Sequence, residues 1–136
     1  MKEQLIKFDT AKLAKEKGFD IKVNSFISDI TGYTLNIGFD NYNRIDMSKG
    51  CYSAPTQSLL QKWLREVHFL WVETTVWGDG IGTQCIIKKA DYKDIEDDRS
   101  RVVKMAKTVD IGFYMKLEFN YEKTLEKGLQ EALKLI

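Results

Sequence analysis

The pattern of apolar and polar positions predicts a central amphipathic helix over residues 54–68. Its apolar residues recur at helical spacing and form one broad stripe, which consists of Leu59, Leu60, Trp63, Leu64 and Val67. We expect Ser53 to cap this helix, because its hydroxyl can accept a hydrogen bond from a first-turn N–H, and Pro55 to lie in the first turn. Arg65 and His68 fall in the last turn, where positive charge suits the exposed carbonyl groups.

Two further helices are predicted near the ends of the chain. Residues 8–18 form a short helix for which Asp9 is the expected N-cap and Gly18 the left-handed residue at the C-terminal end. Asn120 is the expected cap of a C-terminal helix, whose apolar stripe consists of Tyr121, Leu125, Leu129, Ala132, Leu133 and Ile136. Gly128 inside this helix costs about 1 kcal/mol relative to alanine, a cost that a close crossing against another element would justify.

Alternating apolar and polar positions predict strands in the rest of the chain. Residues 69–77 and 81–88 form the clearest hairpin, with a turn at residues 78–80, and residues 109–119 form a third strand. The pattern is weakest over residues 20–50, where we expect one or two short edge strands and loops. The alternating apolar residues there include Ile21, Val23, Ile27, Tyr33, Leu35, Ile37 and Phe39.

These elements predict one α+β domain over residues 1–136. Strands follow a helix without regular βαβ alternation, so we expect an antiparallel sheet with the central and C-terminal helices packed on one face. The register of that sheet and the structure of residues 90–108 stay open, because residues 101–108 fit either a helix or a strand.

The charge composition argues against two classes of partner, nucleic acids and membranes. The chain has 21 basic and 20 acidic residues, a balance that gives no general attraction to nucleic acid or to an anionic membrane. We find no apolar run of the roughly 18 residues that a membrane-spanning helix needs and no apolar stretch typical of a signal peptide near the N-terminus. We therefore expect a cytoplasmic protein in which Cys51 and Cys85 are reduced thiols.

Three segments carry a resemblance. The string Tyr-Ser-Ala-Pro-Thr-Gln…Trp-Leu-Arg-Glu-Val-His at residues 52–68, the segment 8–19 and the C-terminal segment 121–136, which ends in Glu-Ala-Leu-Lys-Leu-Ile, resemble a group of small uncharacterised proteins encoded by phages and integrated elements of gut bacteria. The group has no established activity. The resemblance therefore implies a small cytoplasmic protein of phage-related origin and carries over no functional residue.

Catalytic and metal-binding patterns are weak in this sequence. A helix of this length, about 20 Å long, separates His68 from Cys51, which leaves Cys85 as the thiol that could approach the only histidine. The acidic residues 91–98 lack the glycine and terminal glutamate of a calcium loop. Residues 78–82 are rich in glycine but join two strands instead of leading into a helix N-terminus. We expect no catalytic site, no metal site and no cofactor.

The remaining candidate is a face of the predicted sheet. Trp71 and Trp77 share one face of their strand, and Tyr114 lies on the polar face of another. Exposed, these rings would form a binding face for a protein partner or, as the alternative, for nucleic acid bases. Buried, they would form a second small core under residues 20–50. The favoured hypothesis is a small non-enzymatic protein-interaction or accessory protein. The sequence identifies neither its partner nor its oligomeric state. An enzyme is the least favoured hypothesis.

Overall fold

The computed structural model of this chain describes residues 2–45, 50–77, 82–89, 107–109, 115–116 and 120–136. Within these residues the elements, in chain order, are α1 (Phe8–Glu16), β1 (Phe26–Ser28), β2 (Thr34–Leu35), β3 (Cys51–Ser53), α2 (Gln57–His68), β4 (Leu70–Trp77), β5 (Gly82–Lys89), β6 (Lys107–Val109), β7 (Met115–Lys116) and α3 (Tyr121–Lys134). The predicted α+β class is confirmed.

The described strands form two antiparallel sheets instead of one. The small sheet has the order β2-β1-β3, and the large sheet has the order β4-β5-β6, with β7 also paired to β5. The predicted hairpin is confirmed as β4 and β5, in which Val72 pairs with Ile87 and Thr74 with Cys85. The predicted strand 109–119 is described only at Val109 and at β7, which both pair with β5.

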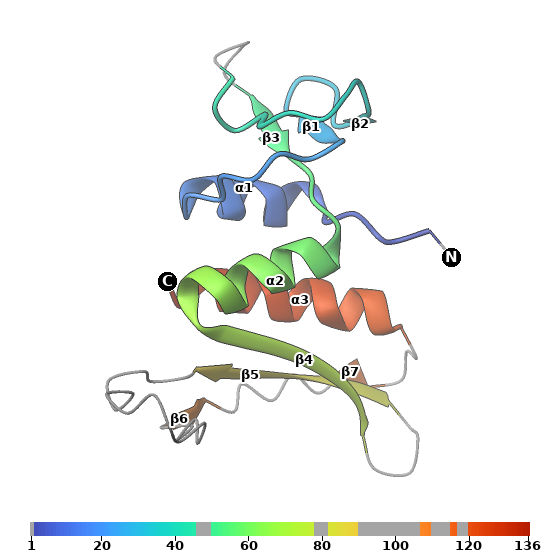
Figure 1. Cartoon of the computed structure of the whole chain (residues 1–136). Helices are drawn as coiled ribbons and strands as arrows, with labels where there is room; N and C mark the ends of the chain where they lie inside the picture. The colour runs from blue at the N-terminus through green and yellow to red at the C-terminus, as the bar shows by residue number, and fades with distance from the viewer. Residues whose placement is uncertain (1, 46–49, 78–81, 90–106, 110–114, 117–119) are drawn as a thin grey trace, which may run out of the picture.

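The molecule is built in layers (Figure 1). The small sheet lies at the top of the view, α1 lies beneath it, α2 and α3 lie side by side in the middle, and the large sheet lies at the bottom. Helix α3 contacts both β4 and β5, and α2 contacts α3 and β4. Both sheets therefore rest, directly or through α1, on the same pair of helices.

The core lies where these helices meet the sheets. Its largest fully buried side chains include Phe19, Leu60, Leu64, Leu70, Ile87, Leu129 and Leu133. Trp63 of α2 packs edge-on against the Phe19 ring, with 5.3 Å between the ring centroids. Two residues of the predicted stripes do not join this core, since Val67 and Tyr121 are exposed.

The predicted N-cap of the central helix is wrong. The helix begins at Gln57, and the Thr56 hydroxyl, not that of Ser53, accepts the hydrogen bond from the Leu59 N–H at 3.2 Å. Ser53 is instead the last residue of β3, where its N–H and hydroxyl are both bonded to Asn43. Pairing of β3 with β1 holds this stretch extended, so the helix cannot start there.

The first helix also begins differently from the prediction. Lys7, not Asp9, is the N-cap of α1, and its side chain makes no capping bond. The Lys7 N–H donates to the Glu126 carboxylate of α3 at 2.7 Å, so a distant side chain performs the capping role. Gly18, at φ +84°, ends the helix in the left-handed conformation as predicted, and Asn120 caps α3 as predicted.

Candidate interaction surface

An apolar arm, which we define as residues 30–39, projects from the small sheet. It carries five large apolar side chains whose exposed fractions run from 42% for Leu35 to 81% for Ile30. The five are Ile30, Tyr33, Leu35, Ile37 and Phe39. Scattered exposed apolar residues are normal on a soluble protein, but a group of five within ten residues is not.

Backbone pairing ties the arm to the small sheet at two points. Leu35 of β2 pairs with Phe26 of β1, and Asp40 exchanges two backbone hydrogen bonds with Val23, at 2.9 and 3.0 Å. Between these points lies Gly38, at φ +144°, a conformation that other residues rarely adopt. The arm is therefore tied to the small sheet at β2 and at the Val23–Asp40 bridge, and its other residues lie outside regular strand.

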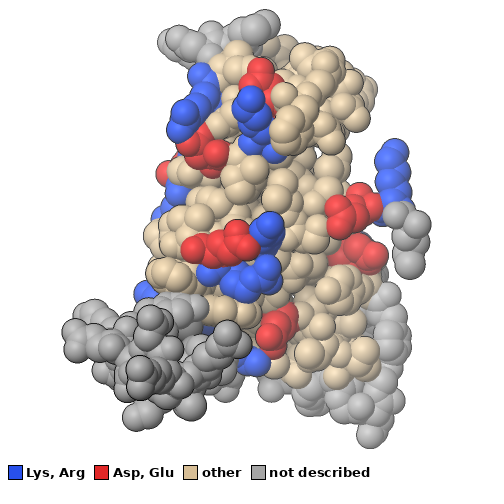
Figure 2. All heavy atoms as spheres, in the orientation of Figure 1, with Lys and Arg blue, Asp and Glu red and all other residues tan. Residues whose placement is uncertain are grey.

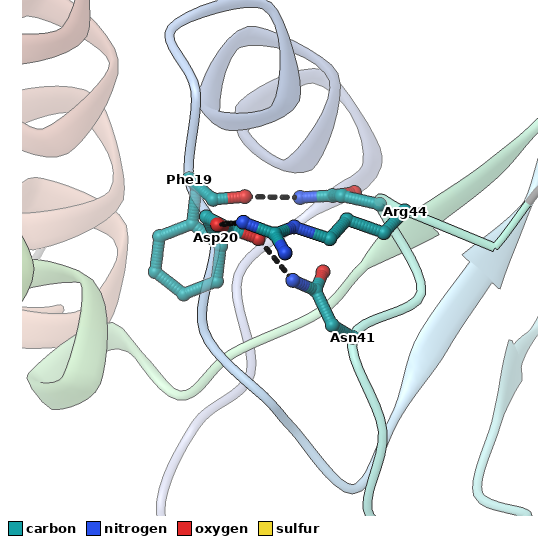
Figure 3. A network of polar contacts seen from close by, with 5 residues as sticks. Phe19, Asp20, Asn41 and Arg44 are labelled. Atoms are coloured by element: carbon teal, nitrogen blue, oxygen red, sulfur yellow. Dashed lines mark hydrogen bonds and ion pairs between the residues drawn. The ribbon is translucent and has the colours of Figure 1, made fainter.

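A polar network fixes the residues that follow the arm (Figure 3). The Asp20 carboxylate accepts hydrogen bonds from the Asn41 amide and the Arg44 guanidinium, both of which point toward it in the view. The Asn43 amide donates to the Phe19 carbonyl at 2.9 Å. These bonds join residues 41–44 to the segment that follows α1, so the chain is held directly after the arm.

The arm has no charged residue in its sequence, although 30% of the whole chain is charged. Figure 2 shows the consequence on one face, where the upper right part of the molecule, the side on which β1 and β2 lie in Figure 1, is nearly free of lysine, arginine, aspartate and glutamate. Charged and paired side chains such as Lys62 and Glu66 of α2 lie elsewhere.

Two recesses lie beside the arm. One, of about 410 Å³, is lined mainly by apolar residues, namely Phe26, Ile37, Gly38, Phe39, Asp40, Tyr42, Ile45 and Cys51. The Phe26 and Tyr42 rings lie against each other there, with centroids 4.7 Å apart. The other, of about 470 Å³, lies between the arm and the start of α2, where Phe39, Leu5 and Leu59 contribute to its wall. The arm thus combines protruding apolar side chains with adjacent hollows.

The predicted aromatic face is only partly described. Trp71 is half-buried in β4 and lies near an ion pair between Glu73 and Lys88, at 2.9 Å. Trp77 ends the same strand, but its side chain, like the whole of Tyr114, lies outside the described residues. Figure 1 places β1 and β2 at the other end of the molecule from β4, so the described part of residues 20–50 does not cover this face.

The thiols and the histidine occupy separate environments. Cys51 lies in β3 and Cys85 in β5, at opposite ends of the molecule, and the two are not joined. Burial, the largest cause, raises the pKa of Cys85 to about 11, so this thiol is protonated at neutral pH and poorly suited to act as a nucleophile. Burial also lowers the pKa of His68, whose ring lies edge-on to Trp63 at 4.5 Å.

A buried carboxylate joins the three helices. Glu126 of α3 accepts hydrogen bonds from the Lys7 N–H, the Thr10 hydroxyl of α1 and the Gln57 amide of α2, the last at 2.8 Å. The Gln130 amide donates to the same Thr10 hydroxyl at 2.9 Å. Both Glu126 oxygens therefore have donors, and we interpret the cluster as a structural junction between helices.

Other predicted features lie outside the described residues. These are the acidic residues 91–98 and all but the last residue of the glycine-rich stretch 78–82. In the part of the chain that the structure describes, no group of three histidine, cysteine, aspartate or glutamate residues is arranged to hold a metal ion. None of the described helices is long and apolar enough to cross a membrane.

Sequence reasoning noticed the alternation of Tyr33, Leu35, Ile37 and Phe39 but missed the arm as a candidate site. Alternation is typical of a strand with one face buried, so it did not indicate that these side chains are exposed. Absence of charge over ten residues would not have found it either, because residues 50–61 also lack charge and are mostly buried or half-buried.

Comparison with known proteins adds no further constraint. No protein-family model, no curated protein and no solved structure matches this chain.

Proposed function

We propose that this protein is an interaction module that contacts another protein molecule through the apolar arm. The observation that carries the proposal is the group of five exposed apolar side chains over residues 30–39. Contiguous apolar patches of this kind mark interaction sites. Covering apolar surface with a partner contributes roughly 25 cal/mol of favourable free energy for each Å² removed from water.

The way in which the arm is built supports the same function. Edge strands of monomeric proteins are commonly protected by lysine, proline or inward-pointing charge, and residues 30–39 contain none of these. The network of Asp20, Asn41 and Arg44 holds the base of the arm. A surface that is already ordered loses less conformational entropy when it binds.

Photocrosslinking tests the proposal. A photoreactive phenylalanine analogue placed at Tyr33 of the full chain, expressed in cells, is expected to form a discrete crosslinked product with a contacted protein. Adding Ile37→Lys should abolish that product, because a lysine in an apolar contact must be desolvated.

The same analogue at Tyr121 is the matched control. Tyr121 is an exposed tyrosine (49%) on α3, away from the arm, and it should not form the product seen from position 33. The proposal is wrong if position 33 forms no discrete product, or if Ile37→Lys leaves the product unchanged while circular dichroism shows the variant to be folded.

A further inference from the structure

We propose that the molecule docked on the apolar arm is a second copy of this chain, with the two arms antiparallel about a two-fold axis. This inference rests on the proposed function and names the partner of that surface. Three properties of the arm support this inference. They are an open strand edge, the absence of charged residues, and the presence of both exposed apolar side chains and a recess on the same surface.

The open edge comes from the topology of the small sheet. In the order β2-β1-β3, β2 is a terminal strand, and its outer edge pairs with no other strand in the part of the chain described. A free edge offers backbone N–H and carbonyl groups that an added strand can pair with. An antiparallel copy of the same segment supplies such a strand.

The absence of charge removes the main obstacle to self-association. In a two-fold dimer the same surface patch of both copies forms the interface. A patch of one charge would therefore face an identical patch and repel it. Residues 30–39 carry no charge. Asp29 and Asp40 flank them in the sequence, and Lys2, Glu3 and Lys22 line the recess between the arm and α2. The side chains of the arm itself therefore add no like-charge repulsion between two copies.

The shape of the patch is self-complementary. An interface between identical surfaces needs knobs and holes on the same patch. Ile37 and Phe39 have exposed fractions of 73% and 66%, and both also line the recess of about 410 Å³, together with Phe26 and Tyr42. Protruding apolar side chains of one copy can therefore enter the recess of the other.

The exposed area is of the size that a dimer needs. Aromatic side chains carry roughly 150–250 Å² each, and from the exposed fractions the five arm side chains together expose on the order of 700 Å². A standard specific interface buries about 800 Å² on each partner. The arm supplies most of that area without a contribution from any other element.

Analytical ultracentrifugation of the purified full chain tests the inference. From about 1 to 500 µM, a range that spans moderate affinities, the chain should change from monomer to dimer and go no further. Ile37→Lys and Tyr33→Lys should each raise the dimer dissociation constant by about tenfold or more, as loss of a central apolar contact does.

Val67→Lys is the matched control, because Val67 is an exposed apolar residue (54%) on α2 outside the arm. It should leave the dissociation constant unchanged. A chain that stays monomeric throughout, that forms species larger than a dimer, or whose dimer withstands both arm variants overturns the inference. If position 33 still crosslinks to a different protein in any of these cases, the proposed function stands and only the identity of the partner falls.

Discussion

At the scale of single residues, Gly128 shows how one position sets the distance between a helix and a sheet. A Cβ built there would lie 2.0 Å from the Cys85 sulfur and 3.1 Å from a Val72 methyl group. From the sequence, an interior helix glycine is unfavourable unless a close crossing justifies it, and the structure shows such a crossing. Glycine therefore lets α3 lie directly on the large sheet.

Gly128→Ala should destabilise the protein despite the better helix propensity of alanine. Overpacking costs about 1–3 kcal/mol, and the helix gains about 1 kcal/mol. The expected net loss, measured by urea unfolding, is therefore up to about 2 kcal/mol, and the very short contact favours the upper end.

Two variants control for this effect. Lys127→Ala, on the exposed side of the same helix, should change stability little. Cys85→Ala removes the clashing sulfur, so a double-mutant cycle should show favourable coupling between positions 85 and 128. Additive losses would contradict the crossing as the cause.

Glu126 is the residue that sequence reasoning could not have found. It lies at a charged position of an amphipathic helix, which normally indicates a solvated face, yet only 4% of it is exposed. Its donors come from Lys7, Thr10 and Gln57, more than sixty residues away in the chain. No local pattern records such a contact, because its partners are brought together only by the packing of α1, α2 and α3.

At the scale of elements, α2 has the predicted apolar stripe but a different start: it begins at Gln57 after the Thr56 cap, so Pro55 precedes the helix and does not lie in its first turn. Its apolar stripe at Leu60, Trp63 and Leu64 is buried, as expected. Ser53 and Thr56 are both good capping residues by type. The choice between them depends on β3, whose pairing with β1 holds Ser53 extended, and pairing partners distant in sequence are not visible from the local pattern.

Thr56→Val should therefore destabilise the protein by about 1 kcal/mol, because the isosteric valine lacks the hydroxyl that accepts from the Leu59 N–H. Thr56→Ser keeps that hydroxyl and should lose much less. Thermal or urea unfolding followed by circular dichroism measures both. No loss in Thr56→Val, which lacks the hydroxyl but keeps a methyl group, would show that the cap does not stabilise α2.

At the scale of the whole molecule, the core and the candidate binding surface lie apart. The helices and the large sheet hold fully buried side chains such as Leu129, whereas the arm projects from the small sheet at the other end (Figure 1). Stability and binding should therefore respond to different substitutions, because the arm residues have little buried area to lose.

Tyr33→Ser and Ile37→Ser should each change the free energy of unfolding by no more than about 0.5 kcal/mol at concentrations where the chain is monomeric. Leu129→Ala, in the core, should cost about 2–5 kcal/mol. Urea titrations of the three variants make the comparison. A large loss from either arm variant would mean that the arm packs on its own protein and is not held ready for a partner.

The sequence by itself determined the elements that local patterns specify: the amphipathic helices, the hairpin of β4 and β5 and the Asn120 cap. Tertiary structure decided the rest, namely the division into two sheets, the cap at Thr56, the burial of Glu126 and the exposure of residues 30–39. The reason is physical. Periodicity shows which side chains share a face, but whether another element covers that face depends on residues far away in the chain.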